Sequence, residues 1–338
     1  MTRYSRQILF EGIGAEGQQL LGASRVLIVG CGALGSAQAE GLARAGVGRL
    51  RVVDRDFVEQ SNLHRQTLFT ERDAAERLPK AVAGARRLAQ INAEVNVEGV
   101  VADVHRGNVE ALIKDCDVVL DGTDNFQTRY LINDACVKHG VNWIYGAAVG
   151  SYGVTMTVRP HATPCLRCVF GEAPGAGGAP TCDTAGVILP IIHMIAAVQI
   201  TEAFKLITRH ETLLHNALLQ FDVWRSEWRR IALGAPDARC PTCAGLQFDT
   251  LGAESAQVSA VLCGRDAVQI APPAPVKLDL IALASRLRKI GEVKSNAYLL
   301  RFSVGEYELS VFLDGRAIVR GTNDITLARS LYAKYIGT

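Results

Sequence analysis

The feature that most constrains this chain is a buried-strand pattern that leads directly into a glycine loop. Residues 25–29 (RVLIV) form a largely β-branched run, and residues 30–35 read GCGALG. A helical pattern follows over 36–45, and a second strand pattern over 49–53 ends at Asp54. This order predicts a βαβ unit in which the loop amides and the start of the helix bind a phosphate group.

The same alternation continues along the next hundred residues or so. Strand patterns over 95–101, 118–121 and 143–145 alternate with helical patterns over 81–91 and 127–139. Strands that alternate with helices are typical of an open α/β sheet. We therefore predict a Rossmann-like, doubly wound sheet for the first part of the chain.

Beyond Gly150 the pattern changes. Residues 152–159 alternate as an antiparallel strand does, and 171–180 (GEAPGAGGAP) can form only a loop. An apolar run over 186–200 predicts a buried helix. Two further strand patterns follow over 217–223 and 227–231. The sheet is therefore expected to continue into antiparallel strands.

The length predicts a second, smaller domain. A chain of 338 residues favours about two domains. We place the first at 1–245 and a small α/β domain at 246–338, with a stiff Pro-rich spacer over 271–276 (APPAPV). The predicted helices and strands of the tail are the helix 278–290, the strands 298–304, 307–312 and 317–320, and the helix 324–335.

Composition excludes several classes of protein. Lys and Arg (36) nearly balance Asp and Glu (34), so no nucleic-acid partner is expected. Residues 1–17 lack the apolar core of a signal peptide. The run over 186–200 is interrupted by Pro190 and Gln199 and is shorter than the ~20 residues of a membrane span. We expect a cytoplasmic protein without a membrane partner, whose nine cysteines form no disulfides.

Positive side chains follow the second strand. Arg65 lies within 61–66 (SNLHRQ), and Lys80 follows Pro79. A triphosphate that loses pyrophosphate requires such cations, because charge builds up on the leaving group. Two alternatives stay open: both cations are solvated surface charges, or the glycine loop and Asp54, which can bind ribose hydroxyls, hold NAD instead.

A carboxylate motif ends the strand over 118–121. Residues 121–125 read DGTDN, and ligands of such sheets lie outside the carboxyl ends of the strands. Beside phosphates, Asp124 is a natural magnesium ligand. It could also cap the helix that follows, and the two roles can coexist.

Paired cysteines predict a metal site. Cys165 and Cys168 form one CxxC knuckle, and Cys240 and Cys243 form another. Four thiolates make a closed tetrahedral set for structural zinc, with a redox pair or buried cysteines as alternatives. Cys182, in TCDTAG after the glycine-rich loop, is either a nucleophilic thiol or a small buried residue.

Taken together, these motifs resemble one family. RYSRQ (3–7), GCGALG, VVDRD (52–56), SNLHRQ, PKA (79–81), DGTDN and the two CxxC pairs are similar, in this order, to the E1-like adenylyltransferases of the ThiF/MoeB/HesA group, over about 1–245. The resemblance implies ATP-dependent adenylylation of the C-terminal Gly-Gly carboxylate of a ubiquitin-like sulfur-carrier protein of ThiS or MoaD type. Pyrophosphate is released, in thiamin-thiazole or molybdopterin biosynthesis, with a separate sulfurtransferase as a further partner.

The resemblance also implies residue roles. It assigns phosphate contacts to Asn62, Arg65 and Lys80, ribose binding to Asp54, magnesium to Asp124 and structural zinc to the four knuckle cysteines. Arg6 would reach the nucleotide of the other subunit, which implies a homodimer. Cys182 matches a cysteine whose function varies among members of the family. The nucleotide-binding set is completed by Gly30, Gly32, Gly35, Asp56, Gln66 and Asn125.

Two other functions compete with this expectation. An NAD-dependent oxidoreductase on the same fold would have no evident use for Arg65, Lys80 and Asp124. A non-catalytic nucleotide sensor would tolerate the loss of these charges. Adenylylation needs no general base, because a carboxylate is already ionised and nucleophilic at neutral pH. This requirement agrees with the lack of an evident Ser/His/Asp set in the sequence.

Overall fold

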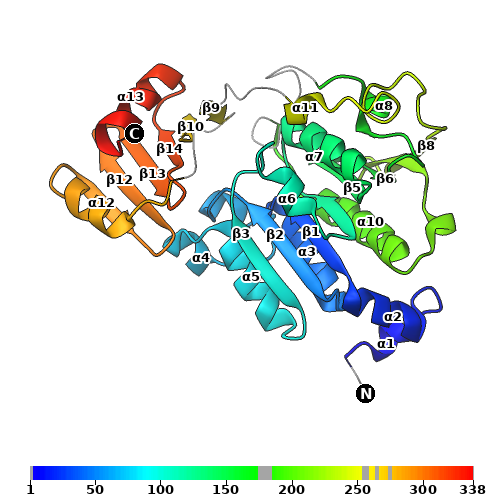
Figure 1. Ribbon diagram of the computed structural model, residues 1–338. Coiled ribbons are helices and arrows are strands. Elements are labelled where there is room, and N and C mark those ends of the chain that lie inside the picture. The colour runs from blue at the N-terminus through cyan, green and yellow to red at the C-terminus, as the bar shows by residue number, and fades with distance from the viewer. Residues whose placement is uncertain (1–2, 174–184, 253–258, 263–265, 273–275, 338) are drawn as a thin grey trace. The chain divides into compact units, whose positions relative to one another are not determined.

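The computed structural model describes residues 3–173, 185–252, 259–262, 266–272 and 276–337 (Figure 1). The chain divides into two compact units, Met1–Ala253 and Glu254–Thr338. Three of our expectations lie wholly or partly outside the described residues. They are Cys182, most of the loop over 171–180 and the middle of the spacer over 271–276.

The first unit contains an eight-stranded sheet in the order β3-β2-β1-β4-β5-β6-β7-β8. The strands from β3 to β5 are parallel, and those from β5 to β8 are antiparallel. This arrangement confirms the predicted fold class. The strands are β1 (Arg25–Val29), β2 (Arg49–Asp54), β3 (Asn96–Val101), β4 (Val118–Asp121), β5 (Asn142–Val149), β6 (Tyr152–Val158), β7 (Ala217–Asp222) and β8 (Glu227–Ala232).

Two groups of helices pack on this sheet (Figure 1). One group comprises α3 (Ala33–Ala45), α5 (Lys80–Ile91) and α10 (Leu189–Ile207), in which α3 contacts both of the others. The other comprises α6 (Val109–Ile113), α7 (Phe126–His139) and α11 (Asp249–Gly252). The remaining short helices are α1 (Ser5–Ile8), α2 (Gly14–Ala23), α4 (Glu71–Glu76), α8 (Leu166–Phe170), and the 3-10 turns η1 (Gln60–Asn62) and η2 (Glu211–Leu213).

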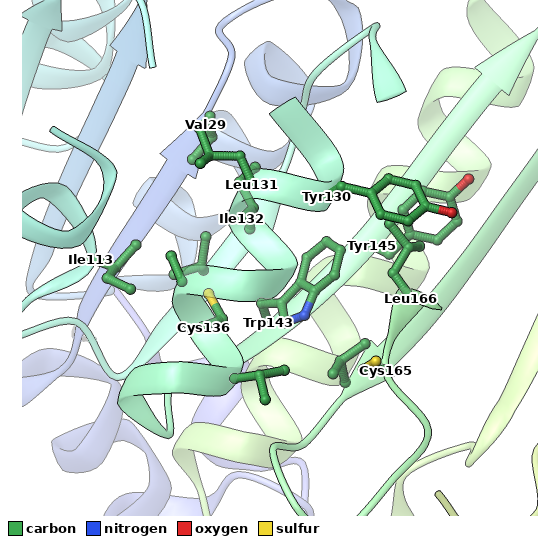
Figure 2. Packing of buried hydrophobic residues seen from close by; sticks show 14 of the residues in the cluster. Val29, Ile113, Tyr130, Leu131, Ile132, Cys136, Trp143, Tyr145, Cys165 and Leu166 are labelled. Atoms are coloured by element: carbon green, nitrogen blue, oxygen red, sulfur yellow. The ribbon is translucent and has the colours of Figure 1, made fainter. Parts of the chain in front are cut away.

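The main core lies between the sheet and α7. Figure 2 shows Trp143 and Tyr145 from β5 packed against Ile132 and Cys136 of α7. Trp143 is completely buried, and its ring makes an edge contact with Tyr145. The same cluster includes Phe248 and Leu251, so α11 belongs to the first unit although it follows residue 245.

The second unit has its own sheet and its own core. The strand order is β11-β12-β13-β14-β10-β9, with antiparallel pairing throughout. Its core packs α12 and α13 against side chains such as Phe302 and Val311. The elements are β9 (Ser259–Leu262), β10 (Ala267–Ile270), α12 (Leu280–Leu287), β11 (Glu292–Ser295), β12 (Leu299–Val304), β13 (Tyr307–Phe312), β14 (Ala317–Arg320) and α13 (Ile325–Tyr335).

Several element boundaries differ from those that the sequence patterns predict. The strand expected over 143–145 extends across Asn142–Val149. The tail helix expected over 278–290 ends at Leu287, and the strand β11 (EVKS) follows it. Polar residues at a sheet edge carry no alternating apolar signal, so the pattern could not indicate this strand.

The apolar helix extends over Leu189–Ile207 and not over 186–200. By length and composition alone it could cross a membrane, and 50% of its most apolar window is buried within the protein. It packs against β5, β6 and α3. Its side chains Gln199 and Glu202 are buried and hydrogen-bonded to other elements. These contacts make it a core helix of the first unit.

The buried amide of Gln199 generates a stability prediction. Gln199 accepts a bond from Gln38 and donates to the carbonyls of Asp121 and Ile144. Gln199→Leu removes these bonds, and we expect a loss of about 2 kcal/mol in the free energy of unfolding, measured by urea titration. Thr201→Ala, on an exposed face of the same helix, is the control. Equal stability of the two variants would contradict this role of Gln199.

Candidate nucleotide and metal sites

In the glycine loop, the backbones of Gly30, Gly35 and Gly122 are in close contact. Gly30 has a φ of +89°, and its N–H donates to the Val53 carbonyl at 2.7 Å. A Cβ on Gly35 would lie 1.8 Å from the Gly30 oxygen, and a Cβ on Gly30 would lie 2.6 Å from the Gly122 oxygen. Only glycine fits at these places, because no shift of a flexible side chain can relieve a clash with backbone.

Gly32 is different, because the space above it is open. The nearest atom that a Cβ there would meet is Nε2 of Gln66, at 3.9 Å. Gly32 directly precedes α3, so the first amides of that helix face this space. A helix start beside open space suits a phosphate group.

Asp54 joins the end of β2 to this loop. Its Oδ2 accepts from the Cys31 N–H at 2.6 Å, and its Oδ1 accepts from the Asp56 N–H at 2.7 Å. Burial raises the pKa of Asp54, and nearby Lys80 opposes that rise. The Lys80 side chain is only 5% exposed, with Nζ 3.4 Å from Oδ2 of Asp56. The structure thus brings Asp54, Asp56 and Lys80 together at the loop.

The segment 61–66 contributes two buried amides and a cation. Asn62 is buried, and its Oδ1 accepts from the Glu59 N–H at 3.1 Å. Gln66 is 3% exposed, and its Oε1 has no partner among the described residues. The Nε2 of the same amide is the atom nearest to the open space at Gly32, so the Gln66 side chain lies at the edge of that space. Arg65 is half-buried and donates to the Ser61 carbonyl at 2.8 Å.

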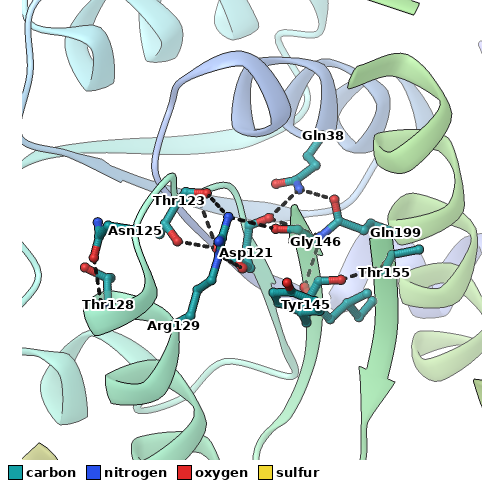
Figure 3. Close-up of polar contacts among 11 residues, drawn as sticks. Gln38, Asp121, Thr123, Asn125, Thr128, Arg129, Tyr145, Gly146, Thr155 and Gln199 are labelled. Atoms are coloured by element: carbon teal, nitrogen blue, oxygen red, sulfur yellow. Dashed lines mark hydrogen bonds and ion pairs between the residues drawn. The ribbon is translucent and has the colours of Figure 1, made fainter. Parts of the chain in front are cut away.

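The end of β4 is held by a buried ion pair. Asp121 is fully buried, and its Oδ2 lies 3.2 Å from Nε of Arg129 (Figure 3). Its Oδ1 accepts from both the N–H and the hydroxyl of Thr123. Arg129 also donates to the Thr123 carbonyl at 2.7 Å. Asp121 and Arg129 therefore both hold Thr123, the residue that precedes Asp124 in the turn.

Asp124 itself has a free carboxylate. Asn125, not Asp124, caps α7, because its Oδ1 accepts from the Thr128 N–H at 2.8 Å (Figure 3). The alternative of Asp124 as a helix cap is therefore wrong. Asp124 is exposed, and in the part of the chain that the structure describes its carboxylate makes no hydrogen bond or ion pair. Such a carboxylate at the carboxyl end of β4 is available to a divalent cation.

Sequence reasoning missed Arg55, which lies between two predicted site residues. Its Nη1 is 3.2 Å from Oδ1 of Asp103, just beyond β3. Burial disfavours its charge, but Asp103, Asp56, Asp124 and Asp54 together raise the pKa of Arg55. The chain thus places a cation among four carboxylates. The sequence clue to Arg55 was its position inside the VVDRD motif. Its partner Asp103 follows a different strand, β3, and lies in no motif.

Arg6 does not reach this site within its own chain. Its helix α1 is fastened at the far end of α3, where Gln7 donates to the Ala45 carbonyl at 2.9 Å and Tyr4 packs on Gly46. The 13 residues of α3 separate that end from the glycine loop by about 20 Å. Arg6 is exposed there.

The two cysteine knuckles meet in space. The Sγ atoms of Cys165, Cys168, Cys240 and Cys243 all lie within 4.8 Å of one another. The separation is 3.6 Å for Cys165 and Cys240 and 3.2 Å for Cys168 and Cys243. Tetrahedral zinc with Zn–S bonds of about 2.3 Å has sulfur separations of about 3.8 Å. The four thiols therefore fit a zinc ion, and Cys165 also packs in the main core (Figure 2).

Removal of one thiolate tests this metal site. We expect Cys240→Ser to lose bound zinc and to lower the free energy of unfolding by about 3 kcal/mol or more, because the metal joins distant segments. Metal analysis and urea titration are the measurements. Cys116→Ser, outside the cluster, should keep its zinc. A Cys240→Ser protein with wild-type stability and metal content would disprove the assignment.

Comparison with known proteins finds similar chains over most of this sequence. The ThiF family matches residues 4–242. The sulfur carrier protein ThiS adenylyltransferase of Bacillus subtilis is 48% identical over 337 residues, which cover 99% of each chain. The SAMP-activating enzyme E1 of Haloferax volcanii is 40% identical over 244 residues, which cover 72% of this chain and 88% of that protein.

Solved structures of Escherichia coli MccB share the fold. The complex of MccB with ATP is 22% identical, with a TM-score of 0.63, and the match covers 72% of this chain and 74% of that one. The relatives in Bacillus and Haloferax give no support to the oxidoreductase alternative. The match to the family model and the nearly full-length similarity to the Bacillus protein show that this chain belongs to the ThiF family.

Proposed function

We propose that this protein adenylylates the C-terminal carboxylate of a ubiquitin-like sulfur-carrier protein with ATP. The observation that carries the proposal is the open space at Gly32 beside the start of α3, in a loop that Asp54 and Lys80 adjoin. The exposed carboxylate of Asp124 follows two residues after Gly122, whose backbone contacts this loop. The names of its relatives in Bacillus and Haloferax support this reaction class. The Bacillus name favours a ThiS-type carrier and the thiazole branch over a MoaD-type carrier.

The reaction needs positioning and charge neutralisation more than acid–base chemistry. A carrier carboxylate oxygen attacks the α-phosphorus of ATP, and the bond from that phosphorus to the bridging oxygen of the β-phosphate breaks. The products are a carrier acyl-adenylate and pyrophosphate. The attacking carboxylate is already ionised, so no base has to remove a proton. Rate then depends on holding the two reactants in line.

Each group at the sheet edge has a role in this proposal. Asp54 binds the ribose, and the amides from Gly30 to Gly35 face the α-phosphate. Lys80, Arg65 and Asn62 contact the phosphates that leave, which stabilises the charge that builds up on them. Magnesium, when bound to the phosphates, would be held by Asp124 and would neutralise part of their charge. Asp56, Gln66 and Asn125 complete the nucleotide pocket.

A protein substrate needs a docking surface, and β8 offers one. It is the last strand of the sheet, so one of its edges is unpaired in the described sheet. All its residues are exposed, and Trp228 is 68% exposed. Trp224, in the turn before it, is 82% exposed. An exposed strand edge with aromatic side chains suits a carrier that adds a strand of its own.

The position of Arg6 supports a homodimer, which we propose as part of the same function. Arg6 is far from its own glycine loop, so it can contact a nucleotide only in a second subunit. Leu9 and Phe10, just beyond α1, are 70% and 64% exposed, as residues of a subunit interface are when the partner is absent. We further propose a cytoplasmic location, a separate sulfurtransferase as the sulfur source, and structural zinc.

ATP–pyrophosphate exchange tests the function. With ThiS-like carrier, ATP and magnesium, the wild-type protein should exchange label between pyrophosphate and ATP. Asp124→Asn should lower this rate about 100-fold, because a neutral amide is a weaker ligand for the magnesium that would neutralise the phosphates. Asp115→Asn, a surface change of the same kind, should stay within about twofold of wild type. The proposal fails if the wild-type protein forms no carrier adenylate with any small carrier of its host.

Mixed subunits test the role of Arg6. Arg6→Ala and Lys80→Ala homodimers should each be inactive. Randomly mixed subunits should regain about a quarter of wild-type exchange, since half of the dimers then contain one intact site. Size-exclusion chromatography of each variant checks that the dimer persists. No recovery in mixed dimers would show that Arg6 does not act across the interface.

A further inference from the structure

Helix α7 is hydrogen-bonded near its middle to both cysteine knuckles and, one turn earlier, to the turn of Asp124. No sequence motif indicated these bonds, which use side chains that the proposed reaction does not. They suggest that the metal site affects the nucleotide site as well as the stability of the chain.

Two adjacent buried side chains in the middle of α7 bond to the knuckles. Asn133 is completely buried, and its Oδ1 accepts from the Leu166 N–H at 2.9 Å, directly after Cys165. Asp134 is 1% exposed, and its Oδ1 accepts from the Thr242 hydroxyl at 3.2 Å, between Cys240 and Cys243. Each knuckle is therefore tied to α7 by its own hydrogen bond.

Asp134 makes additional bonds to the segment after the second knuckle. Its Oδ2 accepts from the N–H and the hydroxyl of Thr250, at 3.2 and 2.7 Å. Asp249, beside Thr250, pairs with Arg167 of the first knuckle at 2.8 Å. A buried carboxylate that accepts several bonds is costly to move, because each lost bond leaves a buried polar group unpaired.

One turn before Asn133, α7 also contacts the turn of Asp124. Arg129 lies four residues before Asn133, on the same face of the helix. It binds the Asp121 carboxylate and the Thr123 carbonyl, which hold the turn of Asp124 (Figure 3). Tyr130 donates to the Gly171 carbonyl at 2.9 Å, where the glycine-rich loop begins. A helix is stiff along its axis, so a shift at the knuckles displaces these contacts as well.

A metal ion would connect the two knuckles to each other. The knuckles are 75 residues apart in sequence, and their thiolates repel one another unless a cation lies between them. A bound zinc ion would hold Leu166 and Thr242 at one separation, and through their hydrogen bonds it would hold Asn133 and Asp134 of α7. Removal of the ion would leave the two knuckles free to separate.

We propose that Asp134 and Thr242 are positioning residues that transmit metal binding at the four-cysteine site to the turn of Asp124, so that the zinc-loaded protein binds ATP more tightly than the metal-free protein. The proposal rests on the proposed function, because it assumes that ATP binds at this turn. It goes beyond a structural role of zinc, which would stabilise the fold without changing the affinity of the folded protein for nucleotide.

The test measures ATP affinity by calorimetry in zinc-loaded and chelated protein. We expect chelation to weaken ATP binding by the wild-type protein about fivefold or more. Thr242→Val removes the hydroxyl and keeps all four cysteines. The zinc-loaded variant should bind ATP as weakly as chelated wild type, with full metal content. Thr201→Val, on the exposed face of α10, is the matched control and should behave as wild type.

Each outcome decides the proposal. Circular dichroism shows whether the chelated protein stays folded; if it unfolds, the zinc-loaded Thr242→Val variant alone decides. Wild-type ATP affinity in that variant, or no effect of chelation on folded wild type, would overturn the proposal. Failure of the zinc-loaded wild-type protein to bind any ATP would instead overturn the proposed function, so the two failures are distinguishable.

Discussion

The contact among the backbones of Gly30, Gly35 and Gly122 is the constraint on which the rest of the structure depends. It brings the start of α3 against the ends of β1 and β4, with separations that no other residue permits. The turn of Asp124 follows Gly122 directly, so this contact also sets the position of that turn relative to the start of α3. The proposed nucleotide site needs the helix start and the Asp124 carboxylate on one rigid edge.

Much of this edge could be predicted because each motif follows a strand whose apolar run is visible in the sequence. Asp54 and Asp124 end or follow such strands, and a parallel sheet brings their carboxyl ends together. Contacts in which one partner lies outside every motif were not predictable. Arg55 pairs with Asp103, and Asp134 pairs with Thr242, across 48 and 108 residues. No local periodicity indicates such pairs, which depend on tertiary packing.

The position of α1 agrees with the expectation for Arg6. The resemblance assigns Arg6 to the nucleotide of the other subunit, and α1 docks through Gln7 at the end of α3 that lies away from its own glycine loop. Under the proposed function, Arg6 therefore acts across a subunit interface. In the second unit, Asp314 and Gly315 lie in the turn between the paired strands β13 and β14, and Gly315 has a φ of +83°, which favours glycine. The polar edge strand β11 had no such marker.

Two carboxylates in one short turn show how environment separates their roles. Asp121 is fully buried, and burial raises its pKa while Arg129 and the Thr123 hydroxyl oppose that rise. The hydrogen bonds that the Asp121 carboxylate accepts come from the chain itself, so Asp121 holds the turn in place. Asp124 follows three residues later, is exposed and keeps its carboxylate unbonded in the described chain. A ligand can recruit Asp124 without breaking any bond of the fold, whereas recruiting Asp121 would dismantle the turn. The chemistry of this edge therefore requires both the buried pair and the free carboxylate beside it.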